Sequence, residues 1–181
     1  DQYDLMYGYW EPIFQEGDID MRFISGDPWD PEERKLRRFK RPCLSFDQLG
    51  QYVNGLVNEV KQNPRAIKLT PAGAEATDDL AERRAEIIRG IEYRSNAQSA
   101  YTWGFQNAVM RSYGSWRVLA KYIADSSFDQ ELVIERILNP SSVLFDPYSQ
   151  QQDFSDGKRA FIVNFISKEQ FASEYPEAKF K

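Results

Sequence analysis

The stretch RPCLSFDQLGQYVNGLVNEVKQNPRAIKLTP, residues 41–71, predicts one helix between two short extended segments. Its apolar residues recur at the spacing of a single buried helix face, namely Leu49, Val53, Leu56, Val57 and Val60. We expect the helix to run from Asp47 to Asn63, with Ser45 or Asp47 as its cap. In Ala66 to Thr70, apolar and polar residues then alternate, which predicts a short strand. None of these residues indicates catalysis.

Further helices are expected on both sides of this stretch. Asp4 to Ile24 is predicted to be partly helical, with breaks at Pro12 and Gly17. A short helix should follow the cap Asp30, with Pro31 in its first position. Two more should start at Thr77 and at Ala97, separated by a joint at Ser95 and Asn96, and the second should stop at Gly114.

The remaining sequence predicts strands. Four segments are rich in branched or aromatic residues and bounded by turn residues: Trp116 to Ile123, Leu132 to Leu138, Ser142 to Phe145 and Ala160 to Ile166. A last short helix should begin at Ser167 and end before Pro176. The predicted fold class is α+β, with helices in the first two thirds and short antiparallel or mixed strands in the last third.

Composition narrows the possible functions. The 181 residues carry 23 basic and 28 acidic side chains, and the net charge of −5 argues against non-specific DNA binding as the main role. The chain has no histidine and one cysteine, Cys43, which disfavours the common triads and zinc sites. No run of about 18 apolar residues appears, so we expect no membrane partner.

The densest charge feature is a basic cluster formed by Arg34, Lys35, Arg37, Arg38, Lys40 and Arg41. On a helix these side chains could contact DNA phosphates or an acidic subunit surface. The alternative is a solvated helix face, partly neutralised by the acidic residues just upstream. We weigh the second interpretation more heavily, because charge runs of this length are common on soluble surfaces.

Three carboxylates, Asp146, Asp153 and Asp156, suggest a metal site at first sight. Their spacing does not match an EF-hand, whereas Asp-Pro and Ser-Asp-Gly are ordinary turn signatures. We therefore predict turns, no bound metal and no cofactor. A metal-dependent nuclease or hydrolase that uses these carboxylates stays as the enzymatic alternative.

Other candidates give weaker signals. Gly104 and Gly114 fit neither a dinucleotide fingerprint nor a phosphate loop. The four tryptophans should be core or subunit-contact residues and not base-stacking platforms, and they are Trp10, Trp29, Trp103 and Trp116. Cys43 should be a small buried hydrophobe. We therefore predict no catalytic residue.

Five motifs occur in a characteristic order between Met21 and Pro176: RPCLSF, QNPRAIKLTP, IEYRSNA, GSWRV and NPSSVLFDPYSQQQDFSDGKRAF. In this order and spacing they resemble the N-terminal part of portal proteins, the head-to-tail connectors of short-tailed phages. The resemblance implies a structural subunit of a dodecameric ring, without catalytic activity, through which DNA passes during genome packaging and ejection.

The resemblance also implies the partners and the location. These are other portal subunits, terminase, tail adaptor and capsid or scaffold proteins, and double-stranded DNA in the channel. The chain would occur in the virion of a phage or prophage, and in the host cytoplasm before assembly. We expect residues 1–181 to be one fragment of the wing or body region, with an N-terminal helical arm over 1–41 and an α+β body over 42–181. The alternative is an interaction module that forms no ring.

Overall fold

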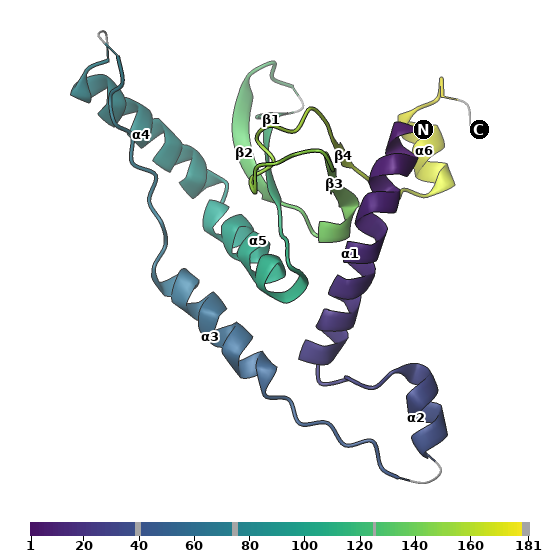
Figure 1. Cartoon of the computed structure of the whole chain (residues 1–181). Coiled ribbons are helices and arrows are strands. Elements are labelled where there is room, and N and C mark those ends of the chain that lie inside the picture. The colour runs from purple at the N-terminus through teal and green to yellow at the C-terminus, as the bar shows by residue number, and fades with distance from the viewer. Residues whose placement is uncertain (39–40, 74–75, 125, 179–181) are drawn as a thin grey trace. The chain divides into compact units, whose positions relative to one another are not determined.

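The computed structural model describes residues 1–38, 41–73, 76–124 and 126–178. It confirms the α+β class, with most helices preceding two small antiparallel sheets (Figure 1). The helices are α1 (Gln2–Ile24), α2 (Pro31–Arg38), α3 (Leu49–Gln62), α4 (Asp78–Arg94), α5 (Ala97–Arg111) and α6 (Lys168–Glu174). The strands are β1 (Trp116–Tyr122), β2 (Gln130–Arg136), β3 (Val143–Phe145) and β4 (Ala160–Ile162), with a 3-10 turn at Pro140–Ser142.

The chain forms two compact units. The smaller unit contains Asp1–Glu11 and Ser141–Lys181, and the larger unit contains Pro12–Pro140. The boundary between them therefore falls inside α1 and again inside the 3-10 turn. The expected division into an arm over residues 1–41 and a body over 42–181 is a different one, and it stays a prediction.

The core of the larger unit lies where α4 and α5 pack against the β1–β2 ribbon (Figure 1). Ala97, Ala100 and Ile134 are buried together, and Ile91 and Tyr101 pack around them. The Tyr101 hydroxyl donates to Glu92 at 3.0 Å. Burial, reinforced by this hydrogen bond to a carboxylate, raises the pKa of Tyr101 to about 12.

Two glycines allow the chain to return over α5. A Cβ atom on Gly114 would lie 1.9 Å from the carbonyl oxygen of Gly104 and 3.0 Å from the amide nitrogen of Ala108. On Gly104 it would lie 3.2 Å from the Trp116 ring. Contrary to prediction, α5 ends before Gly114, at Arg111, where Ser112 takes a positive φ of 72°. Gly114 is therefore required for a close backbone contact and does not stop the helix.

The structure confirms the residues that were predicted to cap the N-termini of the helices. Asp30 accepts from the Glu32 amide at 2.8 Å, and Thr77 accepts from the Leu80 amide at 3.3 Å. Ser167 accepts from the Gln170 amide at 3.1 Å. For α3 the acceptor is Asp47, which binds the Gly50 amide at 2.9 Å. The joint between α4 and α5 is confirmed by Asn96, whose φ of 49° is left-handed.

The predicted breaks in the first helix are wrong. The α1 helix continues through both Pro12 and Gly17. Pro12 removes only the N–H that would bond the exposed Gly8 carbonyl, a loss that water can replace. Gly17 is buried against Arg111, whose Cβ would lie 3.4 Å from a Cβ on the glycine. Here glycine again marks a close contact and not a turn.

The strand predicted at 66–70 is also wrong, because residues 64–73 have no strand partner within the described part of the chain. This extended segment runs beside α4 and contributes Ile67 and Leu69 to a shallow groove that Ala81 and Ala85 also line. Side-chain packing on a helix therefore replaces hydrogen bonding to a neighbouring strand.

The apolar face predicted for α3 is only partly covered. Val57 is buried and Val53 and Val60 are half-buried, but Leu49 and Leu56 are exposed.

The predicted strands exist with shifted ends. The ribbon register pairs Trp116 with Arg136 and Tyr122 with Gln130, so β2 starts earlier than expected and ends before Ile137. The Ile137 carbonyl accepts from the Trp103 indole at 2.9 Å and leaves the ladder. Strand β4 stops at Ile162 instead of Ile166, since β3 offers only three residues for pairing.

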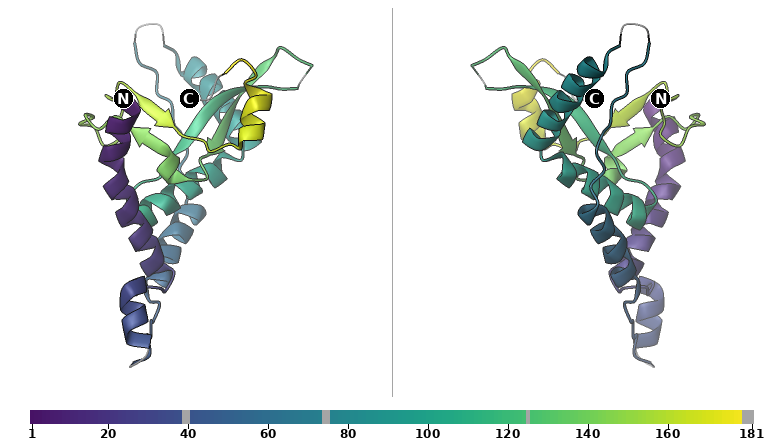
Figure 2. Two further views of the ribbon diagram at one scale, coloured as in Figure 1. Left: turned by 90° about the vertical axis from the view of Figure 1, so that its right-hand side faces the viewer. Right: turned by 90° about the vertical axis from the view of Figure 1, so that its left-hand side faces the viewer.

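The smaller unit assembles β3 and β4 beside the first turns of α1, as both views in Figure 2 show. The indole of Trp10 donates to the Phe145 carbonyl at 2.8 Å. Phe145 and Phe154 stack with ring centroids 4.4 Å apart, and Tyr3 meets Phe161 edge-on at 6.0 Å. The contacts of Trp10 and Tyr3 join residues more than 100 positions apart in the sequence.

We predict that Gly114→Ala lowers the free energy of unfolding by about 3 kcal/mol, the upper range for overpacking, because its methyl group overlaps the Gly104 carbonyl. Urea denaturation followed by circular dichroism measures the change. Gly55→Ala is the matched control: it lies in α3 with nothing within 4 Å of a Cβ, and helix propensity should make it stabilising by about 0.8 kcal/mol. Equal midpoints for the two variants would contradict the assigned role of Gly114.

Candidate functional site

The basic cluster lies on and just after α2, within the larger unit. Lys35 forms an ion pair with Glu32 at 2.9 Å, and Arg34 forms one with Asp27. The guanidinium of Arg37 lies over the ring of Trp29, 4.6 Å from its centroid. Three of the basic side chains thus contact neighbours from residues 27–32.

The other three residues of the cluster are Arg38, Lys40 and Arg41. Arg41 is exposed and appears in no ion pair within the described residues, and its amide donates to the Arg37 carbonyl at 2.8 Å. The side chain of Arg38 and the whole of Lys40 lie outside the described residues. Local acids therefore offset part of the positive charge, which weakens the cluster as a phosphate-binding surface.

The three carboxylates predicted to form turns do so. Asp146 accepts from the amides of Tyr148 at 3.0 Å and Lys158 at 3.1 Å. Asp153 accepts from the Ser155 amide at 3.1 Å. Their oxygens hold the loop between β3 and β4, which is the role that their turn motifs indicate.

Asp156 binds the most donors of the three carboxylates. It accepts from the Gln150 amide at 2.8 Å, from the Gln151 amide at 3.3 Å and from the Ser149 hydroxyl. The Ser149 hydroxyl, followed by these amides, lowers the pKa of Asp156, and bonds to Ser155 lower that of Asp153. Among the described residues, no cluster of three or more acids and thiols is arranged to hold a metal ion.

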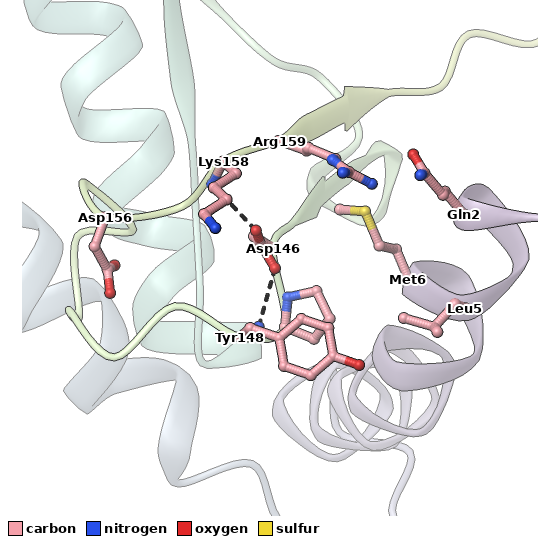
Figure 3. A pocket seen from close by; sticks show the side chains of 9 residues that line it. Gln2, Leu5, Met6, Asp146, Tyr148, Asp156, Lys158 and Arg159 are labelled. Atoms are coloured by element: carbon pink, nitrogen blue, oxygen red, sulfur yellow. Dashed lines mark hydrogen bonds between the residues drawn. The ribbon is translucent and has the colours of Figure 1, made fainter.

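The same loop borders a hollow of about 440 Å³ in the smaller unit (Figure 3). Leu5 and Met6 of α1 form one wall, and Pro147 and Tyr148 form another. Figure 3 shows Arg159 extending toward the first turn of α1, where Gln2 lies. The hollow is apolar inside and bordered by charged side chains from the loop: Asp146, Asp156, Lys158 and Arg159.

The acidic and basic side chains around this hollow differ in the partners that they bind. Both carboxylates accept backbone N–H groups, whereas the exposed side chains of Lys158 and Arg159 form no ion pair within the described ranges. Sequence analysis missed these two cations, although they stand together directly after the Ser-Asp-Gly turn. It could not have found Leu5 and Met6, which are about 140 residues away from the loop.

The four tryptophans make contacts within the chain to different degrees, and a role for any of them in a subunit contact stays a prediction. Trp10 is 5% exposed, and its indole binds a carbonyl, as does that of Trp103. Trp116 meets Tyr101 with ring centroids 5.0 Å apart but stays 45% exposed. The Trp29 indole donates to the Leu44 carbonyl at 3.3 Å. Cys43 is half-exposed, so the prediction of a buried thiol is wrong.

Within the described ranges, no helix combines the length and the apolar character that crossing a membrane requires. The family model "Phage P22-like portal protein" matches residues 1–181. A curated relative, the "Portal protein" of Acyrthosiphon pisum secondary endosymbiont phage 1, is 25% identical over 140 residues, which are 75% of this chain. The match covers 19% of that relative, so the chain spans about a fifth of its length.

We predict that Asp156→Asn speeds hydrogen exchange at the amides of Gln150 and Gln151, because a neutral amide oxygen accepts more weakly than a carboxylate. Asp153→Asn is the control, and its effect should be confined to Ser155. Exchange followed by mass spectrometry or NMR separates the two sites. If Asp156→Asn leaves Gln150 and Gln151 unchanged, the carboxylate does not hold the loop.

Acid should loosen the same loop in wild type. Since the folded-state pKa values of Asp153 and Asp156 are lowered, their stabilisation is present above the ordinary aspartate pKa of about 4 and is lost as pH falls below it. Exchange at Gln150 should therefore accelerate, beyond its intrinsic pH dependence, between about pH 4 and pH 2. The Asp156→Asn variant should lack this step at Gln150.

Proposed function

This chain belongs to the P22-like phage portal protein family, and we propose that it acts as part of a portal ring through which DNA enters and leaves the phage head. The family match over residues 1–181 is the observation that carries this proposal. The role would be structural and not enzymatic. The chemistry of packaging would then belong to a partner ATPase.

Exposed apolar side chains support a role in assembly. On α3, Leu49, Tyr52 and Leu56 are 42%, 73% and 49% exposed at positions i, i+3 and i+7. Helical residues at this spacing share one face, so α3 presents an apolar stripe that its own unit leaves uncovered. Contiguous exposed apolar surface of this kind is typical of protein–protein contacts.

The charge distribution supports passage of DNA without tight binding. The net charge is −5, and local acids engage Arg34 and Lys35 of the basic cluster. Each lysine or arginine that contacts a phosphate adds a salt-dependent contribution to affinity, which would hinder sliding. We propose that the cluster serves a subunit contact and that Arg37 and Arg41 are its main contributors.

The further partners follow from the same proposal. Terminase would dock on the assembled ring during packaging, and tail adaptor and capsid or scaffold proteins would contact it before or after that step. The protein would then occur in the host cytoplasm before assembly and in the virion afterwards. We propose twelve subunits for the ring, the number that the resemblance to portal proteins implies.

We predict that light scattering coupled to size exclusion detects a ring of about twelve copies in the intact protein that contains this chain. The proposal requires a closed oligomer, because heterologous contacts that repeat by rotation close into a ring. A protein that stays monomeric at every concentration tested would contradict it and favour an interaction module without a ring.

The basic cluster can be tested in the same assay. Arg37→Glu with Arg41→Glu should lower the fraction of assembled protein, since both changes place acids on the proposed contact. Arg65→Glu with Lys68→Glu, two exposed changes on the 64–73 segment, alter the net charge by the same amount and serve as the control. Equal assembly of the double variant and the control would remove the cluster from the subunit contact.

A further inference from the structure

The turn between β1 and β2 carries the most exposed large hydrophobic residue of the described chain. Phe128 is 96% exposed, and the neighbouring Tyr122 and Ile123 are 59% and 60% exposed. The Ile123 amide donates to the Asp129 carbonyl at 3.0 Å, which closes the ribbon just before this turn. A large aromatic ring therefore stands at this end of the ribbon and is left in water.

An acid stands beside this ring. The Asp129 amide donates to the Ser127 hydroxyl at 3.1 Å, and that hydroxyl lies 3.3 Å from the Asp129 carboxylate. Within the described residues Asp129 belongs to no ion pair, and neither Phe128 nor Asp129 contributes to the core of the larger unit. The hairpin end thus combines one large apolar group with an available negative charge.

The hollow of the smaller unit has the complementary properties (Figure 3). Its walls include Met6, 4% exposed, together with Leu5 and Pro147. Its rim holds the two cations, Lys158 and Arg159, that no described carboxylate pairs. At about 440 Å³ the hollow lies in the usual size range of pockets that bind small groups.

We propose that the hairpin end of one copy docks into the hollow of a second copy, with the Phe128 ring inside and Asp129 against Lys158 and Arg159. Burying an aromatic side chain supplies most of the attraction, and the opposite charges orient the contact. Both carboxylates at the hollow are held in the loop by N–H groups, and neither forms an ion pair with Lys158 or Arg159 within the described residues, so the two cations can pair with the incoming acid.

This contact joins two different surfaces, which makes it heterologous, and repetition of it around an axis yields a ring or an open chain. The inference rests on the proposed function, because it assigns one of the contacts that ring assembly needs. It goes beyond that function by naming the residues on each side.

Cross-linking between single-cysteine variants tests the contact directly. In a Cys43→Ser background, Phe128→Cys is mixed with a differently tagged Tyr148→Cys, whose side chain is 78% exposed at the hollow. A short bismaleimide should join the two variants into a mixed dimer. Tyr93→Cys, 89% exposed on α4, replaces Phe128→Cys as the control and should give at least about 10-fold less product.

Assembly measurements supply an independent test without cysteines. Phe128→Ser should weaken self-association by about 30-fold, a typical loss when an aromatic hot spot is truncated. Tyr93→Ser should change it by less than about threefold. Asp129→Lys and Lys158→Asp should each weaken association, and mixing these two variants should restore it, because the charges are then exchanged across the contact.

The outcomes separate the contact from the proposed function. Normal oligomers, with no mixed cross-link and no effect of Phe128→Ser, would overturn the docking and leave ring assembly intact. Absence of self-association in the wild-type protein would overturn both. A doubly substituted Phe128→Cys, Tyr148→Cys chain that cross-links only within a monomer would show that the hairpin end fills its own hollow, and this would also overturn the docking.

Discussion

The contact between Gly114 and the backbone of α5 at Gly104 is the constraint on which the larger unit depends. Any Cβ at Gly114 would overlap the Gly104 carbonyl, so no other residue allows the chain to pass at this distance. This close approach of residue 114 to α5 determines where β1 begins, and it places Trp116 over Gly104 and beside Tyr101. Through the ribbon register it also brings Ile134 onto Ala97 and Ala100.

Local signals were predictable from sequence because their physics is local. Asp30, Thr77 and Ser167 begin helices at the expected positions, since a side-chain oxygen near a free amide needs no tertiary contact. Glycine and proline were misinterpreted where tertiary packing decides. Gly17 and Gly114 allow close approach, and Pro12 lies within a helix that continues past it. These contacts depend on residues far away in the sequence.

In the candidate sites too, local features could be predicted from the sequence and tertiary contacts could not. Turn chemistry around Asp146 and Asp156 could be predicted, because both acceptors lie within 12 residues of their donors. The hollow beside them could not be predicted, since one of its walls comes from Met6 of α1 and no sequence spacing relates that residue to Lys158. The partial neutralisation of the basic cluster could be predicted in part. The sequence shows the acidic residues upstream of the cluster, but only the structure shows that Arg34 pairs with Asp27.

A two-stranded ribbon is marginally stable in water unless another surface covers one face. Here α5 covers the ribbon at Ile134, while Leu132 and Tyr122, which lie nearer the turn, are 49% and 59% exposed. The far end of the ribbon is therefore the part with least support from its own unit. Any partner that binds only the folded ribbon stabilises it by mass action. If the proposed assembly uses this end of the ribbon, its folding and the assembly are coupled, and a change that loosens the ribbon should weaken association even when it touches no partner.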